Sequence, residues 1–250
     1  GVCGHVHLTA DPLLILTALA FLVPWARLAT ALRRSYYAAS SWALRVRMGR
    51  RLGATVLVYA AAMERRDTWP LVRAIAKAGR RDLILVLDTR GGDISAGLQV
   101  MRALAAHPGP TTVVVPDECW SAGTLAALAA DRISLAHAAN LGFCDSILNN
   151  DSAHLFAGPI ATAAVLGESV ERVRARHSLR DISEEIARAR MARGDGRVQA
   201  QQLACAMTHS DSDHFQPVFI ERARDLGLRV MPLGDDKVWS KLVTFDGWAR

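Results

Sequence analysis

From about residue 54 onward, short apolar runs alternate with segments in which apolar residues recur at helical spacing. The β-branched run at Ala54–Tyr59 predicts a buried strand, and Leu83–Leu87, Thr111–Val115 and Arg132–Leu135 predict three more. Between them, helical spacing covers 69–78, 93–107 and 121–130. Strand alternating with helix predicts an α/β fold with a mainly parallel sheet. We expect the strongest run, 83–87, to lie at its centre.

The second half of the chain reads differently. Helical patterns dominate from about 158 to 207, and residues 214–226 predict a further helix that ends at Gly227. The simplest division is therefore one globular domain over residues 53–250. An N-terminal hydrophobic and basic helical segment, residues 1–52, precedes it.

That N-terminal segment contains the most apolar run of the chain. Leu13–Val23 is uninterrupted but shorter than the roughly 20 residues that span a bilayer. Three interpretations stay open: a short transmembrane helix that anchors the protein with Trp25 at the interface, an interfacial amphipathic helix, or a helix packed between subunits. A cleaved secretion signal is disfavoured because no charged region precedes the run. We favour the anchor.

The arginines that follow this run set the orientation. Arg33 and Arg34 lie on one side only, which predicts a membrane-associated protein with its globular domain on the cytoplasmic face. A cytoplasmic protein without an anchor is the alternative.

Composition narrows the function classes. Of 250 residues 51% are hydrophobic and 22% charged, which excludes a disordered chain. The formal charge is +6, and three of the 30 basic residues are lysines, which leaves 27 arginines scattered singly or in doublets. Without a long basic run we expect no nucleic-acid binding. The four cysteines never form a C-x-x-C pair, so we expect no metal site. A chain of this size does not need disulfides, so we expect a reducing compartment. We also expect no cofactor.

Two segments contain candidate chemistry. In LILVLDTRGGDISAG (83–97) a strand runs into Gly91-Gly92 and then a helix, a turn that exposes N–H groups able to bind an anion or a developing oxyanion. In VPDECWSAGTLAALAADRI (115–133) Ser121 opens an alanine-rich helix, with the Ala122 N–H as a candidate oxyanion donor. Each segment also has an ordinary structural interpretation: a tight turn that binds nothing, and a serine that caps its helix.

The two segments together resemble a known superfamily. A Gly-Gly turn followed 30 residues later by S-A-G and then A-A-D-R-I is similar to the Clp protease/crotonase superfamily. The chain more closely resembles the serine dehydrogenase proteinase family, relatives of signal peptide peptidase A. That family's T-P-G-G, M-S-G-G-T-L-I-A-L-A-A-D-E-I and L-G-P-V-D-P elements correspond to residues 89–92, 120–133 and 141–145. Two further family elements, T-H-D and A-x-x-L-G-L, are similar to residues 208–209 and 223–228. The resemblance thus covers roughly residues 54–232.

This resemblance implies a fold and a function. The fold is a Clp/crotonase-like spiral of strand–strand–helix units, assembled as a homo-oligomer. The function is hydrolysis of peptide or protein substrates, with Ser121 as nucleophile and Gly91, Gly92 and Ala122 at the oxyanion hole. Two alternatives stay open: a catalytically impaired family member that serves as a scaffold or assembly subunit, and a crotonase-like acyl-thioester enzyme.

The general base departs from the family pattern. Clp-type enzymes place a histidine about 25 residues after the serine, where this chain has Phe143 and Cys144. Enzymes of the signal peptide peptidase type use a lysine, but none occurs between Lys77 and Lys237, and an arginine stays protonated. His209, in the family-like Thr-His element, is the best substitute, with Asp145 or Asp211 to orient it. A water molecule or no base at all are the alternatives.

Overall fold

The computed structural model describes residues 12–144, 147–150, 153–156, 170–208, 216–234 and 236–249. Its centre is a five-stranded parallel sheet in the order β1-β2-β3-β5-β9. The five strands are β1 (Ala54–Ala60), β2 (Asp82–Asp88), β3 (Thr111–Val115), β5 (Arg132–Leu135) and β9 (Val230–Pro232). The predicted α/β class with a mainly parallel sheet is therefore confirmed.

The central strand differs from the prediction. We expected residues 83–87 at the centre, but β2 is second in the order and β3 is central, with β5 and β9 beyond it. A strongly apolar run indicates that a strand is buried, but it does not indicate where in the sheet the strand lies. Here β9, a short strand far along the chain, adds to the β5 edge and moves the centre to β3.

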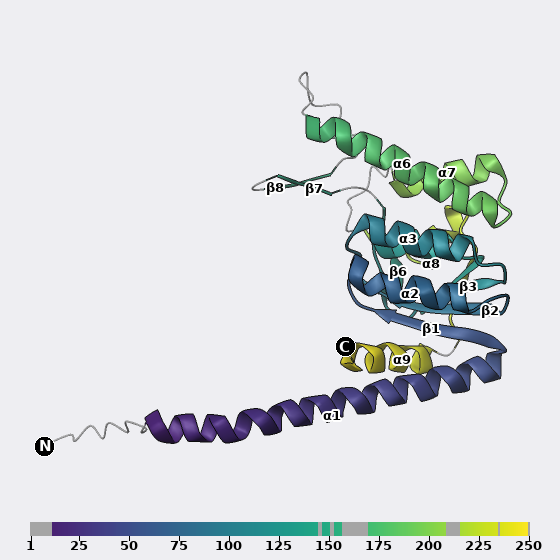
Figure 1. The fold of residues 1–250 in the computed structure, drawn as a ribbon. Helices are drawn as coiled ribbons and strands as arrows, with labels where there is room; N and C mark the ends of the chain where they lie inside the picture. The colour runs from purple at the N-terminus through teal and green to yellow at the C-terminus, as the bar shows by residue number, and fades with distance from the viewer. Residues whose placement is uncertain are drawn as a thin grey trace, which may run out of the picture.

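Helices lie on both sides of the sheet (Figure 1), and alternate residues of the strands face these two layers. Leu83, Leu85 and Leu87 belong to the larger core, which also contains residues of α2 (Arg65–Lys77), α3 (Ile94–Ala105) and α4 (Ala122–Leu128). Val86 faces the smaller core, with Leu242 of α9 (Asp236–Ala249). The sheet is therefore covered on both faces, as a parallel sheet requires.

Residues that follow the strands also pair in short bridges. Met63 bridges Gly92, Thr89 bridges Cys119, and β4 (Glu118–Cys119) pairs in parallel with β6 (Asn140–Leu141). These bridges bring the residues after β1, β2 and β3 into register beside the sheet, which is where both candidate motifs lie.

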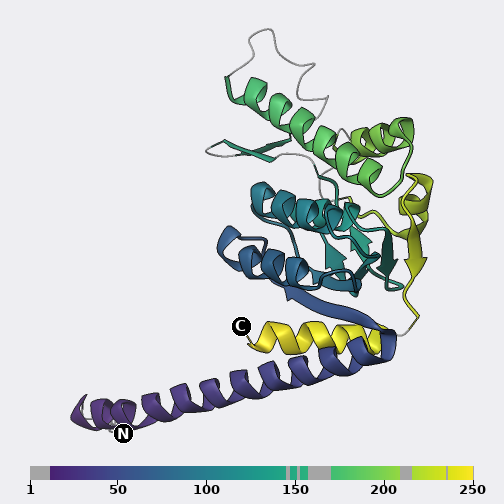
Figure 2. The same ribbon diagram turned by 45° about the vertical axis from the view of Figure 1, so that its right-hand side comes forward.

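Two further helices lie over α3 and α4. They are α6 (Val170–Ala192) and α7 (Arg197–Thr208), which pack against each other (Figure 2). Arg102 of α3 forms an ion pair of 2.9 Å with Glu185 of α6. The antiparallel pair of β7 (Ile147–Asn150) and β8 (Ala153–Phe156) was not predicted.

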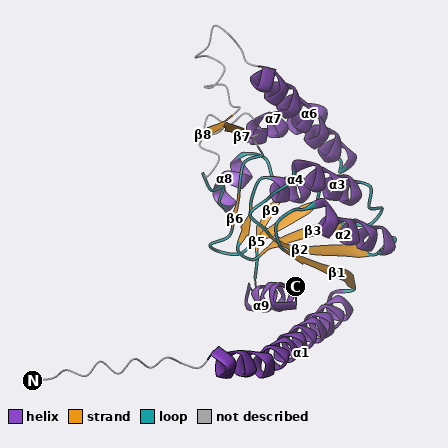
Figure 3. Cartoon of the chain, turned by 60° about the vertical axis from the view of Figure 1, so that its left-hand side comes forward, coloured by secondary structure: helices purple, strands orange, loops and turns teal. Residues whose placement is uncertain are grey.

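The N-terminal segment is one helix, α1 (Pro12–Leu52), which Figure 3 shows extending away from the sheet. Its last turns pack on the sheet through Leu44 and Met48, and the rings of Tyr37 and Phe245 of α9 lie 5.7 Å apart. Over the described residues, no helix has both the length and the apolar character needed to cross a bilayer. The transmembrane helix that the sequence predicts is therefore not found among those residues.

Two predicted helix boundaries also change. The helix expected at 69–78 begins four residues earlier, at Arg65. The helix expected at 214–226 is α8 (Ile220–Asp225), because Val218 exchanges two backbone hydrogen bonds with Leu141 and so cannot be helical. The start of the predicted helix, residues 214 and 215, lies outside the described residues. The strand β9 and the helix α9 were not predicted.

Candidate active site

The Gly-Gly turn lies directly against Ser121. Gly91 and Gly92 have φ angles of +92° and +143°, which side-chain-bearing residues rarely adopt. A Cβ on Gly91 would lie 2.8 Å from the Trp120 carbonyl oxygen and 3.0 Å from Ser121 Cβ. Only glycine allows this approach, so the turn after β2 and the start of α4 form one site, as their spacing in the sequence predicts.

Ser121 has an unusual backbone. Its φ of +47° and ψ of −113° make it the one non-glycine residue with positive φ among those the structure describes. Such a conformation costs about 1–3 kcal/mol and persists only where surrounding contacts impose it. Ser121 occupies the N-cap position of α4, yet its side chain makes no capping hydrogen bond. The interpretation of Ser121 as a simple cap is therefore not supported, and Ser121 is half-buried at the mouth of the helix.

The backbone N–H groups around Ser121 are not equivalent. The Gly91 N–H donates to Thr89 Oγ1 at 3.1 Å. Neither the Gly92 N–H nor the Ala122 N–H donates a hydrogen bond to any residue that the structure describes. Gly92 is also exposed, whereas Gly91 is buried. Of the two glycines, Gly92 is thus the better placed to donate to a bound group.

Hydrogen bonds hold the start of α4 to its neighbours. Thr124 Oγ1 donates to the Cys119 carbonyl oxygen at 2.7 Å and accepts from the Gly142 N–H at 3.3 Å. A Cβ on Gly97 of α3 would lie 2.4 Å from the Ala122 carbonyl oxygen, so α3 and α4 are in backbone contact. These contacts fix the orientation of the residues that flank Ser121.

The other end of α4 is held by a buried arginine that the sequence did not single out. Arg190 of α6 is 1% exposed and donates through Nη1 to the carbonyl oxygens of Leu128 and Ala130 at 3.1 and 2.8 Å. Its Nε pairs with Asp195 at 2.7 Å. The available signal was its position four residues after the buried Ile186, on the apolar face of the helix.

The region where a Clp-type histidine would lie is filled differently. Phe143 and Cys144 are both buried. The Cys144 thiol lies 3.7 Å from the Ser121 carbonyl oxygen and donates to it, and the Cys144 N–H donates to the Met207 carbonyl oxygen at 2.8 Å. The structure thus brings Cys144 to the backbone of Ser121, a contact that sequence reasoning missed. His209, Asp145 and Asp211 lie outside the described residues.

A charged cluster borders the site. Glu118 accepts from Arg90 Nε at 2.7 Å and from the Trp120 indole N–H at 3.1 Å, which links the glycine turn to the segment before Ser121. Burial, and after it the charge of Asp117, raises the pKa of the Asp88 carboxyl above its ordinary value. Burial likewise raises the pKa of the Cys119 thiol, which keeps it protonated and unreactive.

No group of three or more histidine, cysteine or acidic side chains in the described ranges has the geometry of a metal site. The described part of the site offers a serine hydroxyl beside two backbone donors. A hydroxyl beside a pair of N–H groups suits attack on a carbonyl group, because the donors stabilise the oxyanion that forms.

The chain is similar in sequence to proteins of an archaeon. Two relatives, the uncharacterized proteins MJ0137 and MJ1495 of Methanocaldococcus jannaschii, are each 29% identical to the chain over 174 and 170 residues, which is 66% and 63% of it. The chain spans 59% and 55% of their lengths.

Two solved structures share the fold. A serine-to-alanine mutant of the 1510-N membrane-bound stomatin-specific protease has a TM-score of 0.52 at 18% identity, covering 74% of this chain and 82% of that one. A lysine-to-alanine mutant of the same protease, in complex with a substrate peptide, has a TM-score of 0.51 at 19% identity, covering 72% and 74%. A sequence model of the ClpP-like SDH-type serine proteinases matches residues 52–246. The chain therefore belongs to the family of ClpP-like SDH-type serine proteinases.

Proposed function

We propose that this protein is a serine peptidase in which Ser121 is the nucleophile. The observation that carries the proposal is the strained Ser121 backbone held against the Gly91-Gly92 turn, with a hydroxyl that does not cap its helix. Membership of a serine proteinase family supports the same reaction.

In this reaction Ser121 Oγ bonds to the carbonyl carbon of the peptide, and its proton passes to a base. The Gly92 and Ala122 N–H groups donate to the oxyanion. The C–N bond then breaks as the amine leaving group takes up a proton, and a water molecule hydrolyses the serine ester. Gly91 supports this arrangement through its turn, since its own N–H is used by Thr89.

We propose His209 as the base that receives the Ser121 proton. It lies just after α7, whose residue Met207 accepts a hydrogen bond from the Cys144 N–H, and Cys144 in turn contacts Ser121. This chain of contacts supports a position for the segment after α7 on the side of α4 where Ser121 lies.

A fluorophosphonate ester, which labels activated serines, tests the nucleophile. The wild-type protein is expected to label, and Ser121→Ala is expected not to. Ser240→Ala, at an exposed serine of α9, is the matched control and is expected to label like the wild type. Labelling of Ser121→Ala would refute the assignment.

The same reagent tests the base. His209→Ala is expected to slow labelling by about 10²–10⁴-fold. His137→Ala, at an exposed histidine after β5, is expected to leave the rate unchanged. Equal rates for the two variants would remove His209 from the mechanism.

A second function, a scaffold without peptidase activity, is favoured by the buried Phe143 and Cys144, which fill the region of the Clp-type histidine. If the folded wild-type protein did not react with the fluorophosphonate ester, the scaffold function would be supported. For either function we propose a homo-oligomer, as in the superfamily that the sequence resembles. We also propose that the globular domain lies on the cytoplasmic side of a membrane, because Arg33 and Arg34 follow the apolar run on one side only. Light scattering checks the assembly, and a monomer would contradict it.

A further inference from the structure

Helix α1 presents an apolar stripe that no described part of the chain covers. Trp25, Leu28, Leu32 and Tyr36 follow one another at steps of three or four residues, so they share one face of the helix, and each is at least half exposed. Further steps of the same size lead to Trp42 and Val46. Leu44 and Met48, which pack on the sheet, belong to the opposite face. The part of the stripe from Trp25 to Tyr36 therefore lies uncovered by the described residues.

Arginines flank this stripe on both sides. Helical spacing places Arg27 near one border and Arg33, Arg47 and Arg51 along the other. Residues 12–52 contain seven arginines and no acidic residue. An apolar stripe between two basic borders is the pattern of a helix that lies in the plane of an anionic membrane surface.

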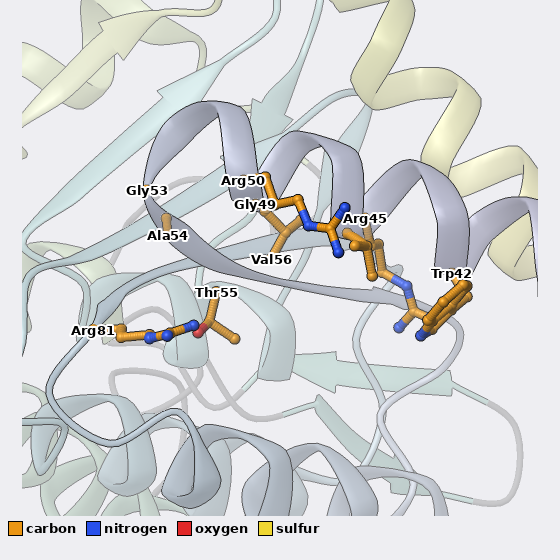
Figure 4. Close-up of a pocket in the computed structure, with 10 residues that line it drawn as sticks. Trp42, Arg45, Gly49, Arg50, Gly53, Ala54, Thr55, Val56 and Arg81 are labelled. Atoms are coloured by element: carbon orange, nitrogen blue, oxygen red, sulfur yellow. The ribbon is translucent and has the colours of Figure 1, made fainter.

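The stripe ends at a basic pocket between the last turns of α1 and strand β1. This pocket has a volume of about 620 Å³, and Trp42 and Val46 of the stripe line it. Figure 4 shows Arg45 and Arg50 coming from α1 and Arg81 lying beside Thr55 of β1.

Glycine and charge both shape this pocket. A Cβ on Gly49 would lie 2.7 Å from the Ala54 carbonyl oxygen, so glycine allows α1 to approach β1 closely. None of the described residues that line the pocket is acidic, and the neighbouring Asp82 lines a different cavity. Guanidinium groups arranged around a hollow suit a phosphate group, which accepts several charge-assisted hydrogen bonds.

We propose that α1 lies along an anionic membrane surface, with its stripe in the headgroup layer and a lipid phosphate in the pocket lined by Arg45, Arg50 and Arg81. This inference deepens the proposed membrane association by naming the lipid class and the residues that bind it. It does not depend on the Ser121 chemistry, because vesicle binding requires no catalysis.

A second copy of α1 is the competing occupant of the stripe. The spacing of Trp25, Leu28, Leu32, Trp42 and Val46 is compatible with a helix pair. Pairing would, however, bring seven arginines from each helix together, with no acidic residue on either helix to offset them. Anionic lipid supplies the missing negative charge, which is why the stripe and the arginines together favour the membrane.

Co-sedimentation of the full chain with lipid vesicles tests the proposal. We expect binding to phosphatidylcholine vesicles that contain phosphatidylglycerol, and little binding to phosphatidylcholine alone. Replacing Arg45, Arg50 and Arg81 together by glutamine is expected to lower the partition coefficient about 100-fold, since each basic residue near such a surface contributes about fivefold.

A matched triple variant keeps the same change in net charge. Arg73, Arg222 and Arg224 are exposed on α2 and α8, and their replacement by glutamine is expected to lower binding less than about fivefold. An equal loss of vesicle binding in both triple variants would mean that only the net charge of the protein matters. That result would contradict a phosphate site in the pocket. Far-UV circular dichroism confirms that each variant is folded.

Two further results separate the alternatives. Leu28→Gln with Leu32→Gln is expected to weaken vesicle binding at least tenfold and to leave the molecular mass in sedimentation equilibrium unchanged. A drop in mass would instead assign the stripe to a second copy. If inorganic phosphate abolished vesicle binding completely, the pocket would be a site for free anions. If the protein bound vesicles of phosphatidylcholine alone as well as vesicles with phosphatidylglycerol, the charge of the lipid would have no role. Each result would overturn the proposal, while serine labelling would be unaffected.

Discussion

Helices α4 and α1 carry the two sites of this molecule, and they are built in opposite ways. All seven residues of α4 are buried, and its one polar side chain, Thr124, is satisfied by the backbone of neighbouring segments. Helix α1 has 41 residues, packs through its last turns and exposes residues 27–36. The position of α4 is therefore fixed by the core, whereas the described outer face of α1 is left to contact something else.

The largest expected effect concerns the anchor of α4. Arg190→Met leaves the carbonyl oxygens of Leu128 and Ala130 without a donor and Asp195 without its buried partner, so the free energy of unfolding is expected to fall by about 3–5 kcal/mol. Arg188→Met, at an exposed position of the same helix, is expected to cost at most about 1 kcal/mol. Urea unfolding measures both, and similar losses would show that α4 does not depend on Arg190.

A smaller effect is expected where α3 meets α4. Alanine favours a helix by about 1 kcal/mol over glycine, yet Gly97→Ala would push a Cβ against the Ala122 backbone, so we expect a net loss of about 1–3 kcal/mol and slower serine labelling. Gly247→Ala, in open space on α9, is expected to stabilise the protein by up to about 1 kcal/mol. Stabilisation by both changes would mean that the α3–α4 contact is loose.

The pH dependence at the border of the site is a smaller effect. Because burial raises the pKa of Asp88, the folded protein binds this proton more tightly than the unfolded chain, and stability falls as the pH rises from 3.8 through the raised value. Asp88→Asn removes that loss, so the variant should gain stability over the wild type at pH 7 and not below the unfolded pKa.

Asp93 provides the control of opposite sign for Asp88. Its hydrogen bonds with Ser95 lower the pKa of its carboxyl, so the stability it contributes is present above the unfolded pKa and is lost as the pH falls through the lowered value. Asp93→Asn is therefore expected to lower the urea midpoint at pH 7 and to have little effect in acid. The same sign for both variants would contradict these assignments.

The smallest effect is expected on α1. Leu28→Gln and Leu32→Gln are each expected to change the free energy of unfolding by no more than about 0.5 kcal/mol, because both side chains are exposed. Leu125→Ala in α4 is the buried counterpart, with an expected cost of about 2–5 kcal/mol. Thermal unfolding followed by circular dichroism compares them, and a large loss at Leu28 would mean that the stripe is covered.

Sequence patterns predicted those parts of the fold in which local signals and burial agree. The strands at 54–60 and 82–88 carry β-branched or leucine runs, and Asp93, a residue type that favours helix starts, caps α3 by accepting from the Ser95 N–H. The strand β9 gave no such signal, because it has three residues and two of them are exposed at the sheet edge. Its partner β5 lies almost 100 residues earlier, a pairing that local patterns do not contain.

The candidate site was predictable to a similar degree. Two glycines and a serine at the ends of adjacent strands indicated that they meet, and the structure places them in contact. The contact of Cys144 with Ser121 and the hold of Arg190 on α4 depend on distances between distant segments, which spacing does not encode. For the same reason the sequence predicts that a base is needed but does not identify it.

The complete burial of α4 also has a consequence for the motions of the protein. A helix with no solvent-exposed side exchanges its amide hydrogens only when the surrounding core opens, so the amides of α4 should report the global free energy of unfolding. The exposed turns of α1 around Leu28 and Leu32 can open locally at far lower cost. Ser121, which needs a fixed orientation, is thus attached to a helix whose amides exchange slowly. The stripe on α1, which is available to a partner, lies where the amides exchange fast.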